Sequence, residues 1–296
     1  MVSCRSHKRG GQSVRRILAA AIFFAAVSAG SLFAQSPEPF AGTLLASEQE
    51  QATGGAGEGA PNGAAGSATG GAYGDTTSGQ LRRLRDLVYN NAAPDEVSRL
   101  AATLIKMAQG LSSPAERLVT QSKIEYLSGR SWQEHGDNKK AIEYFEAALK
   151  HAEQAGDITQ TAEALFAGTK ALSQLVLLKG MPYLLANGPK ISPNAKKVLA
   201  MEPGHPGAQI MLASSKAYPP AAFGGAPKEA IKQMQDLLKS HQNGFEKDIL
   251  FDIRTCLGTA YSKLGDTVSA SFWFRKALGL YPRNDYAKTE LEKLAK

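Results

Sequence analysis

The sequence is short of cysteine, which excludes two kinds of stabilising site. Its 296 residues include two cysteines, and Cys4 lies in a basic leading segment that we expect to be removed. Cys256 alone cannot close an internal disulfide or supply a cluster of thiolate ligands, and the histidines show no metal-ligand spacing. We therefore predict a fold held by packing, with no metal or other cofactor. Cys256 is expected to be a small buried hydrophobe.

Catalytic motifs are also lacking. The sequence has no H-E-x-x-H, no G-x-S-x-G and no phosphate-binding loop. Carboxylates such as Glu125, Glu134, Glu143 and Glu146 lie in stretches of helical periodicity, where a solvated outer face explains them. The sequence predicts a protein that is not an enzyme.

Concentrated basic charge is absent from the body of the chain. The formal net charge is +7, but five basic residues lie within residues 5–16, and without them about +2 remains. Nucleic-acid binding normally needs a basic face, whereas these Lys and Arg residues are scattered along helical stretches. We therefore expect no nucleic-acid partner.

The chain opens with the basic "MVSCRSHKRGGQSVRR" and continues with the apolar "ILAAAIFFAAVSAGSLFA". This order is typical of a secretory signal peptide, here residues 1–34, with small residues suited to cleavage after Ala29 or Ala34. An uncleaved anchor is the alternative, because residues 17–34 approach the length of a bilayer span. The prediction is an exported protein of the periplasm or cell envelope, which contacts the membrane only if this segment is retained.

Residues 35–80 are low in complexity, as in "QATGGAGEGAPNGAAGSATGG", and carry acidic residues without any Lys or Arg. Large apolar side chains are almost absent, so the segment cannot bury enough surface to offset its ordering entropy. We predict a Gly/Ala/Ser-rich disordered linker between the signal and a folded domain.

From Leu81 onward, apolar residues recur every three or four positions, as in "LRRLRDLVYNNA" and "DEVSRLAATLIKMA". No stretch sustains the alternation of a half-buried strand. Prolines such as Pro94 and Pro114 suit the first turn of a helix. The sequence therefore predicts an all-α domain over residues 81–296.

Two segments of this domain share one spacing of small and aromatic residues. The positions in "SGRSWQEHGDNKKAIEYFEAALK" are Gly129, Trp132, Gly136, Ala141, Phe145 and Ala148; those in "LGTAYSKLGDTVSASFWFRKALGLYP" are Gly258, Tyr261, Gly265, Ala270, Phe274 and Ala277. The pattern resembles the tetratricopeptide repeat (TPR), a helix–turn–helix unit of about 34 residues. The resemblance covers about residues 115–283 and implies a TPR-like α-solenoid of stacked helical hairpins.

Between these segments the units are degenerate, and two turns are enlarged. "YPPAAFGG" replaces a bare Gly–Asp turn within one repeat, and residues 179–193, "KGMPYLLANGPKISP", form a second enlargement one repeat earlier. Because such turns emerge on one edge of a solenoid, we expect Tyr183, Tyr218 and Phe223 to be neighbours in proline-stiffened loops. They either contact a partner or fill a gap between poorly matched repeats.

The concave surface of a solenoid is lined by the first helix of each hairpin. At lining positions the first clear repeat has Lys123, Tyr126, Arg130 and Gln133, and the last has Asp252, Thr255, Thr259 and Lys263. The first set suits an extended peptide or an anionic group, because Lys and Arg form charge-assisted hydrogen bonds. Our candidate partner-binding residues are Lys123, Tyr126, Arg130, Gln133, Tyr183, Tyr218, Phe223 and Lys263.

An exported helical-repeat chain with a "YPP…GG…AI" turn is also similar to the T component of TRAP-type solute transporters. That resemblance implies an accessory subunit that contacts a periplasmic substrate-binding protein or an apolar solute. The sequence departs from that family in lacking a lipid-attachment cysteine. The leading prediction is an exported TPR scaffold that binds a protein or peptide, and the transporter accessory is the alternative. A continuous apolar lining beside the enlarged turns would favour a solute, and a polar one a peptide.

Overall fold

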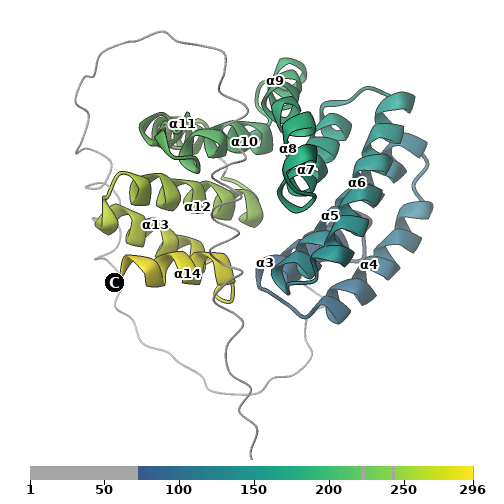
Figure 1. Cartoon of the computed structure of the whole chain (residues 1–296). Helices are drawn as coiled ribbons and strands as arrows, with labels where there is room; N and C mark the ends of the chain where they lie inside the picture. Colours follow the sequence, from purple (N-terminus) through teal and green to yellow (C-terminus); the bar gives the residue numbers. More distant parts are fainter. Residues whose placement is uncertain (1–72, 222–223, 242–243, 296) are drawn as a thin grey trace, which may run out of the picture.

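The computed structural model describes residues 73–221, 224–241 and 244–295, and every regular element in these ranges is a helix (Figure 1). The predicted signal and most of the predicted linker lie outside the described residues. In chain order the helices are α3 (Thr77–Tyr89), α4 (Pro94–Gln109), α5 (Pro114–Glu134), α6 (Asn138–Ile158), α7 (Ala162–Leu178), α8 (Met181–Asn187), the 3-10 helix η1 (Gly188–Lys190), α9 (Ile191–Met201), α10 (Pro206–Ala217), α11 (Pro227–Ser240), α12 (Lys247–Lys263), α13 (Thr267–Leu278) and α14 (Asp285–Leu294).

The first described helix begins before the boundary expected at residue 81. Thr76 caps α3, because its Oγ1 accepts a hydrogen bond from the backbone N–H of Gly79 at 3.1 Å. A Cβ at Gly79 would lie 1.7 Å from the carbonyl oxygen of Tyr73, so only glycine fits this approach. Residues 77–80, which composition assigns to the linker, therefore belong to α3. Their Gly and Ser content lowers the helix propensity of this stretch, so composition did not predict the start of α3.

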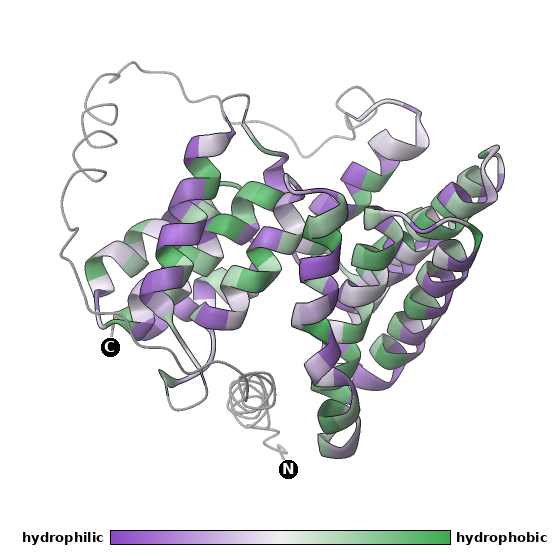
Figure 2. Cartoon of the chain, turned by 90° about the horizontal axis from the view of Figure 1, so that it is seen from above, coloured by the Kyte–Doolittle hydropathy of each residue, from purple (hydrophilic) through white to green (hydrophobic). Residues whose placement is uncertain are grey.

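Consecutive helices pack as hairpins, and the hairpins stack into a curved solenoid (Figure 1). Helix α5 packs along α6, α10 along α11 and α12 along α13, while α14 covers the end of the last pair. The helices carry both hydrophobic and hydrophilic residues along their length (Figure 2). Within the described ranges, none is long and apolar enough to span a bilayer. The all-α solenoid predicted from the sequence is confirmed.

A glycine facing a phenylalanine ring fixes the closest approach within the two clear hairpins. A Cβ at Gly129 of α5 would lie 2.8 Å from the ring of Phe145 on α6, and one at Gly258 of α12 would lie 3.0 Å from the ring of Phe274 on α13. Both rings are fully buried. The predicted role of the small residues, to let two helices approach around an aromatic wedge, is confirmed.

The turns of these hairpins have the geometry that Gly–Asp predicts. Gly136 and Gly265 adopt φ values of 89° and 78°, in the region that favours glycine. Asp137 and Asp266 then cap α6 and α13, each accepting a backbone N–H bond at 3.0 Å. One residue pair thus ends one helix and starts the next.

The two enlarged turns differ from each other in structure. Tyr218–Ala226 connects α10 to α11 as predicted, and a Cβ at Gly225 would lie 2.1 Å from the carbonyl oxygen of Pro219. Residues 179–193, however, are largely helical, so the proline-stiffened loop expected there is wrong. Pro182 lies in the first turn of α8, where no backbone N–H is needed, and the buried Leu184 anchors the short helix.

The first and last parts of the described chain meet, which local sequence patterns do not predict. Arg85 on α3 forms an ion pair with Asp248 on α12 at 2.6 Å. The carboxylate of Asp86, also on α3, accepts hydrogen bonds from the hydroxyls of Tyr73 at 2.5 Å and Tyr281 at 2.7 Å. Tyr281 follows α13 and is fully buried. These contacts close the solenoid on itself.

We expect Gly129→Ala to lower the free energy of unfolding by about 1–3 kcal/mol, because the added methyl group overpacks the Phe145 contact. Gly156→Ala is the matched control: it lies within α6 and a Cβ there would meet nothing within 4 Å. That variant should gain about 0.4–1 kcal/mol through the unfolded chain. Chemical denaturation measures both, and a stabilised Gly129→Ala protein would contradict the close-approach argument.

A second prediction concerns the closure. Asp86→Ala leaves the buried hydroxyl of Tyr281 without its acceptor, so it should cost about 2–3 kcal/mol. It should also raise amide hydrogen exchange in α3. Asp285→Ala removes an exposed bond from Asn91 at the same junction, 2.7 Å long, and should cost about 0.5–1 kcal/mol. Equal losses of unfolding free energy in the two variants would show that the buried bonds to Asp86 stabilise the fold no more than the exposed bond does.

Candidate binding surface on the inner face

Five side chains from α3, α5, α7 and α12 are linked to one another by hydrogen bonds, a cation–ring contact or electrostatic interaction. We call this surface the inner face and define it by Tyr89, Tyr126, Arg130, Lys170 and Asp252. Burial is the largest influence on the pKa values of Tyr89, Arg130 and Asp252, and groups on the other helices of this set also act on each of the three. The inner face therefore unites residues from opposite ends of the described chain.

Arg130 provides a partly buried cation on α5. Its guanidinium donates to the hydroxyl of Tyr126 at 3.4 Å and to Glu134 at 3.1 Å. Burial works against the charge, but Tyr126, Glu134 and Tyr89 outweigh it, so the pKa of Arg130 lies well above its ordinary value. Its Nε is buried without a hydrogen-bond partner in the described part of the chain. Such a donor favours a ligand that can accept from it.

Lys170 on α7 adds a second cation, which the sequence did not single out. Its Nζ lies 4.4 Å from the centroid of the Tyr126 ring and 5.8 Å from that of Phe166. No carboxylate of the described residues lies within ion-pair distance of it. Helix α7 lacks the Gly–Asp turn that marks the clear repeats, so its lining positions could not be numbered from the sequence.

Asp252 on α12 supplies the opposite charge. Its carboxylate accepts hydrogen bonds from the hydroxyl of Tyr89 at 3.1 and 3.2 Å. Burial raises the pKa of Asp252 to about 6, while the charges of Lys170 and Arg130 act in the opposite direction. Neither cation is within ion-pair distance of it. Unlike charges thus influence one another across the inner face without being in contact.

Other predicted lining residues have partners within the fold. Lys123 forms an ion pair with Glu163 on α7 at 2.7 Å, and Glu163 also approaches His205 at 3.7 Å. His205 and Lys123 hold the pKa of Glu163 at about 2. Thr259 shares a hydrogen bond of 2.8 Å with Tyr286 of α14. Lys123 and Thr259 therefore join neighbouring helices.

Some predicted residues flank this surface or lie away from it. Gln133 is half-buried one helical turn beyond Arg130, and Lys263 is exposed at the last residue of α12. The hydroxyl of Thr255 donates back to the carbonyl of Phe251 within its own helix at 3.1 Å. Only Tyr126 and Arg130 of the proposed partner-binding set belong to the inner face as defined.

Tyr183 and Tyr218, which belong to the two enlarged turns, have different contacts in the structure. Tyr218 packs beside the α10–α12 core, and its hydroxyl lies 3.5 Å from that of Tyr286. Tyr183 belongs to α8, where Lys179 lies 4.7 Å from its ring centroid. Tyr183 and Tyr218 thus pack against different neighbours, and Phe223 lies outside the described residues. The paired-turn site therefore stays a prediction.

Reactive groups are scarce over the same ranges. Cys256 is 1% exposed and packs among apolar side chains, and burial raises its pKa to about 12, so it carries no thiolate. This confirms its predicted role as a small buried hydrophobe. The described residues hold no group of three or more His, Cys, Asp or Glu side chains placed to bind a metal ion.

Comparison with known proteins places a repeat in the last hairpin. The family model of the tetratricopeptide repeat matches residues 255–284, which run from α12 through α13. This match and the Gly–Phe packing of both clear hairpins identify the fold as a TPR-like α-solenoid. No curated protein matches the chain significantly in sequence.

Two solved structures match the chain at low sequence identity. One is a thermophilic TPR protein of Thermus thermophilus, with 14% identity, a TM-score of 0.49, and coverage of 74% of this chain and 99% of that one. The other is YrrB, described as a TPR protein with an unusual peptide-binding site, with 14% identity, a TM-score of 0.31, and coverage of 73% and 91%.

The raised pKa of Asp252 predicts a pH-dependent effect of Asp252→Asn. Because the folded-state pKa, about 6, exceeds the ordinary value, protonation favours folding below about pH 4 and this contribution is lost as pH rises through 6. The Asn side chain does not titrate. Relative to the wild-type protein, Asp252→Asn should therefore gain about 1–3 kcal/mol between pH 4 and pH 7.5. Urea denaturation at both pH values measures this, and an unchanged difference would refute it.

Proposed function

We propose that the protein is a non-catalytic scaffold that binds an extended segment of a protein or peptide on its inner face. One observation carries this proposal. The positive charges of Lys170 and Arg130 act to lower the pKa of Asp252, yet no two of these three residues form an ion pair. A peptide backbone has acceptors and donors along its length, so it can bridge such separated charges. Charge-assisted hydrogen bonds of this kind are stronger than neutral ones.

The aromatic residues of the inner face suit the same ligand. The Tyr126 ring is 9% exposed and lies between Phe145 and the ammonium of Lys170, and the Tyr89 ring packs against Phe251 and Tyr281, so both rings are held rigidly at the edge of this surface. Rigid aromatic side chains provide contact area at a small entropic cost. The stacked helices hold them in place, which is how solenoids present concave binding surfaces.

The polar character of this region favours a peptide over an apolar solute. The hydroxyls of Thr259 and Tyr286 lie beside Tyr218 in the enlarged turn. Burial raises the pKa of Tyr218, and the nearby carboxylate of Asp252 adds to this increase. These polar groups support the peptide proposal over the T-component alternative, for which a continuous apolar lining is expected. Export to the periplasm or envelope remains part of the proposal, supported by the basic and apolar order of residues 1–34.

The test is selection of random 12-residue peptides on the purified full chain, followed by affinity measurements on the enriched sequences. Lys170→Met keeps the aliphatic stem over Tyr126 but removes the charge, so it should weaken binding at least tenfold. The matched control is Lys197→Met on α9, which is exposed and should leave affinity unchanged. Enriched peptides that bind equally to both variants would place the binding surface elsewhere.

A further inference from the structure

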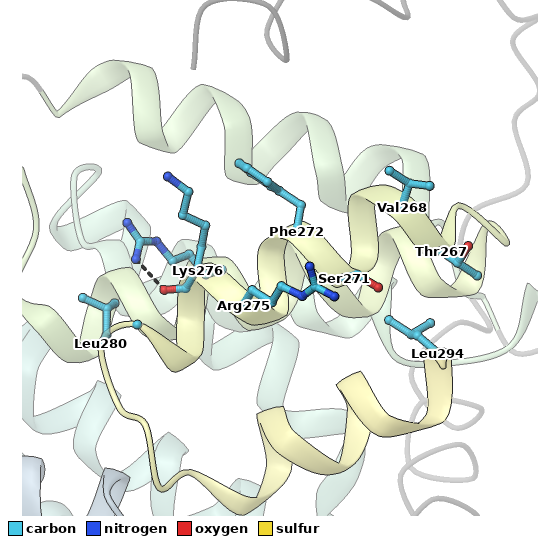
Figure 3. A pocket seen from close by; sticks show the side chains of 10 residues that line it. Thr267, Val268, Ser271, Phe272, Arg275, Lys276, Leu280 and Leu294 are labelled. Atoms are coloured by element: carbon cyan, nitrogen blue, oxygen red, sulfur yellow. Dashed lines mark hydrogen bonds between the residues drawn. The ribbon is translucent and has the colours of Figure 1, made fainter. Parts of the chain in front are cut away.

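A second surface lies at the end of the solenoid, apart from the inner face. It is a groove of about 800 Å³ along α13, to which α12 contributes Arg254 and α14 contributes Leu294 (Figure 3). Val268 and Phe272 lie along α13, with Leu280 near one end of the groove and Leu294 of α14 near the other. Val268 is 80% exposed. With the half-buried Phe272, Leu280 and Leu294 it forms an apolar patch beside polar residues, and such patches mark interaction sites.

The position of the groove follows from the repeat. Helix α14 packs against α12 and α13 in the place that the first helix of another hairpin would take. No second helix follows it in the described residues. The sides of α13 and α14 that such a helix would border are therefore open, and the groove has the form of a helix-docking surface.

The charge of the groove restricts what can occupy it. Arg254, Arg275 and Lys276 contribute to its lining, and none of its lining residues is acidic. Arg275 and Lys276 are exposed, and neither is in an ion pair with any described residue. The ammonium of Lys276 lies 5.4 Å from the centroid of the Phe272 ring. The complementary ligand is therefore an acidic segment with large apolar side chains.

The chain itself contains such a segment. Residues 37–50, "PEPFAGTLLASEQE", hold all the large apolar residues between 35 and 72, which are Phe40, Leu44 and Leu45. The same segment carries Glu38, Glu48 and Glu50 and has no basic residue. Phe40 and Leu44 are four residues apart, the spacing that would make them neighbours if this segment docked as a helix. Composition thus matches the groove in both charge and hydrophobicity.

The point where the described chain begins is also near the groove. The hydroxyls of Tyr73 and Tyr281 share the carboxylate of Asp86, and Tyr281 directly follows Leu280 of the groove. Residues 51–72 separate Tyr73 from the acidic segment and are rich in Gly and Ala. A Gly-rich chain of that length spans about 26 Å on average. This exceeds the length of α13, about 18 Å for a helix of its size.

We propose that residues 37–50 dock onto the α13–α14 groove of the same molecule. Phe40, Leu44 and Leu45 cover Val268 and Phe272, and the glutamates face Arg275 and Lys276. A short tether gives such a segment an effective concentration in the millimolar range. Part of the segment that composition assigns to the linker is then a ligand of the folded domain.

The test is a competition between the tethered segment and a free one. A labelled synthetic peptide of residues 36–51 is titrated into the full chain and into the full chain with Phe40→Ser, Leu44→Ser and Leu45→Ser. The peptide should bind the triple variant and should bind the wild-type chain at least tenfold more weakly, because the wild-type groove is already occupied. A peptide of the same composition in scrambled order is the control and should not bind either protein.

Charge reversal then locates the site. Adding Arg275→Glu and Lys276→Glu to the triple variant should abolish peptide binding, and both positions are exposed, so the fold is preserved. Absence of binding to the triple variant, or equal binding to it and the wild type, would overturn the proposal. If the wild-type mass rises with concentration and the triple variant stays monomeric, the segment docks between two copies, which overturns docking within one chain.

Discussion

The approach of a bare helix backbone to a phenylalanine ring sets the spacing of the two best-formed hairpins. At Gly129 and Gly258 an added Cβ would lie 2.8 and 3.0 Å from a buried phenylalanine ring, so the backbone of one helix packs directly against a ring of the other. The positions of the other side chains on these helices depend on this contact. The position of Arg130, one residue after Gly129, is fixed by the same contact, because a helix held at one residue cannot rotate at the next.

The local parts of this structure could be predicted because they depend on residues close in sequence. Gly136 allows the turn between α5 and α6, and Asp137 caps α6, as the Gly–Asp pair predicts. Cys256 is buried, because the repeat pattern places it on the inward side of its helix. Helix α8 was missed because Pro182 was taken as a loop signal, although proline is well tolerated in a first helical turn.

The candidate site was predictable only in part. Tyr126 and Arg130 follow from the first clear repeat, whereas Lys170 comes from a hairpin without the motif that would number it. Tyr89 meets Asp252 across 163 residues, and no local pattern encodes that distance. The pairing depends on the curvature accumulated over all the intervening hairpins, each of which contributes a small rotation.

An ordinary stack of helical hairpins behaves as a one-dimensional array, in which each unit senses only its neighbours and the terminal units fray first. Here Arg85 and Asp86 tie α3, the first described helix, to the last hairpin of the array. Its ends become mutual neighbours, and the unfolding of one removes support from the other. Such a ring should melt as one cooperative unit, and its final closing step should be slow, because contacts of long sequence separation form late.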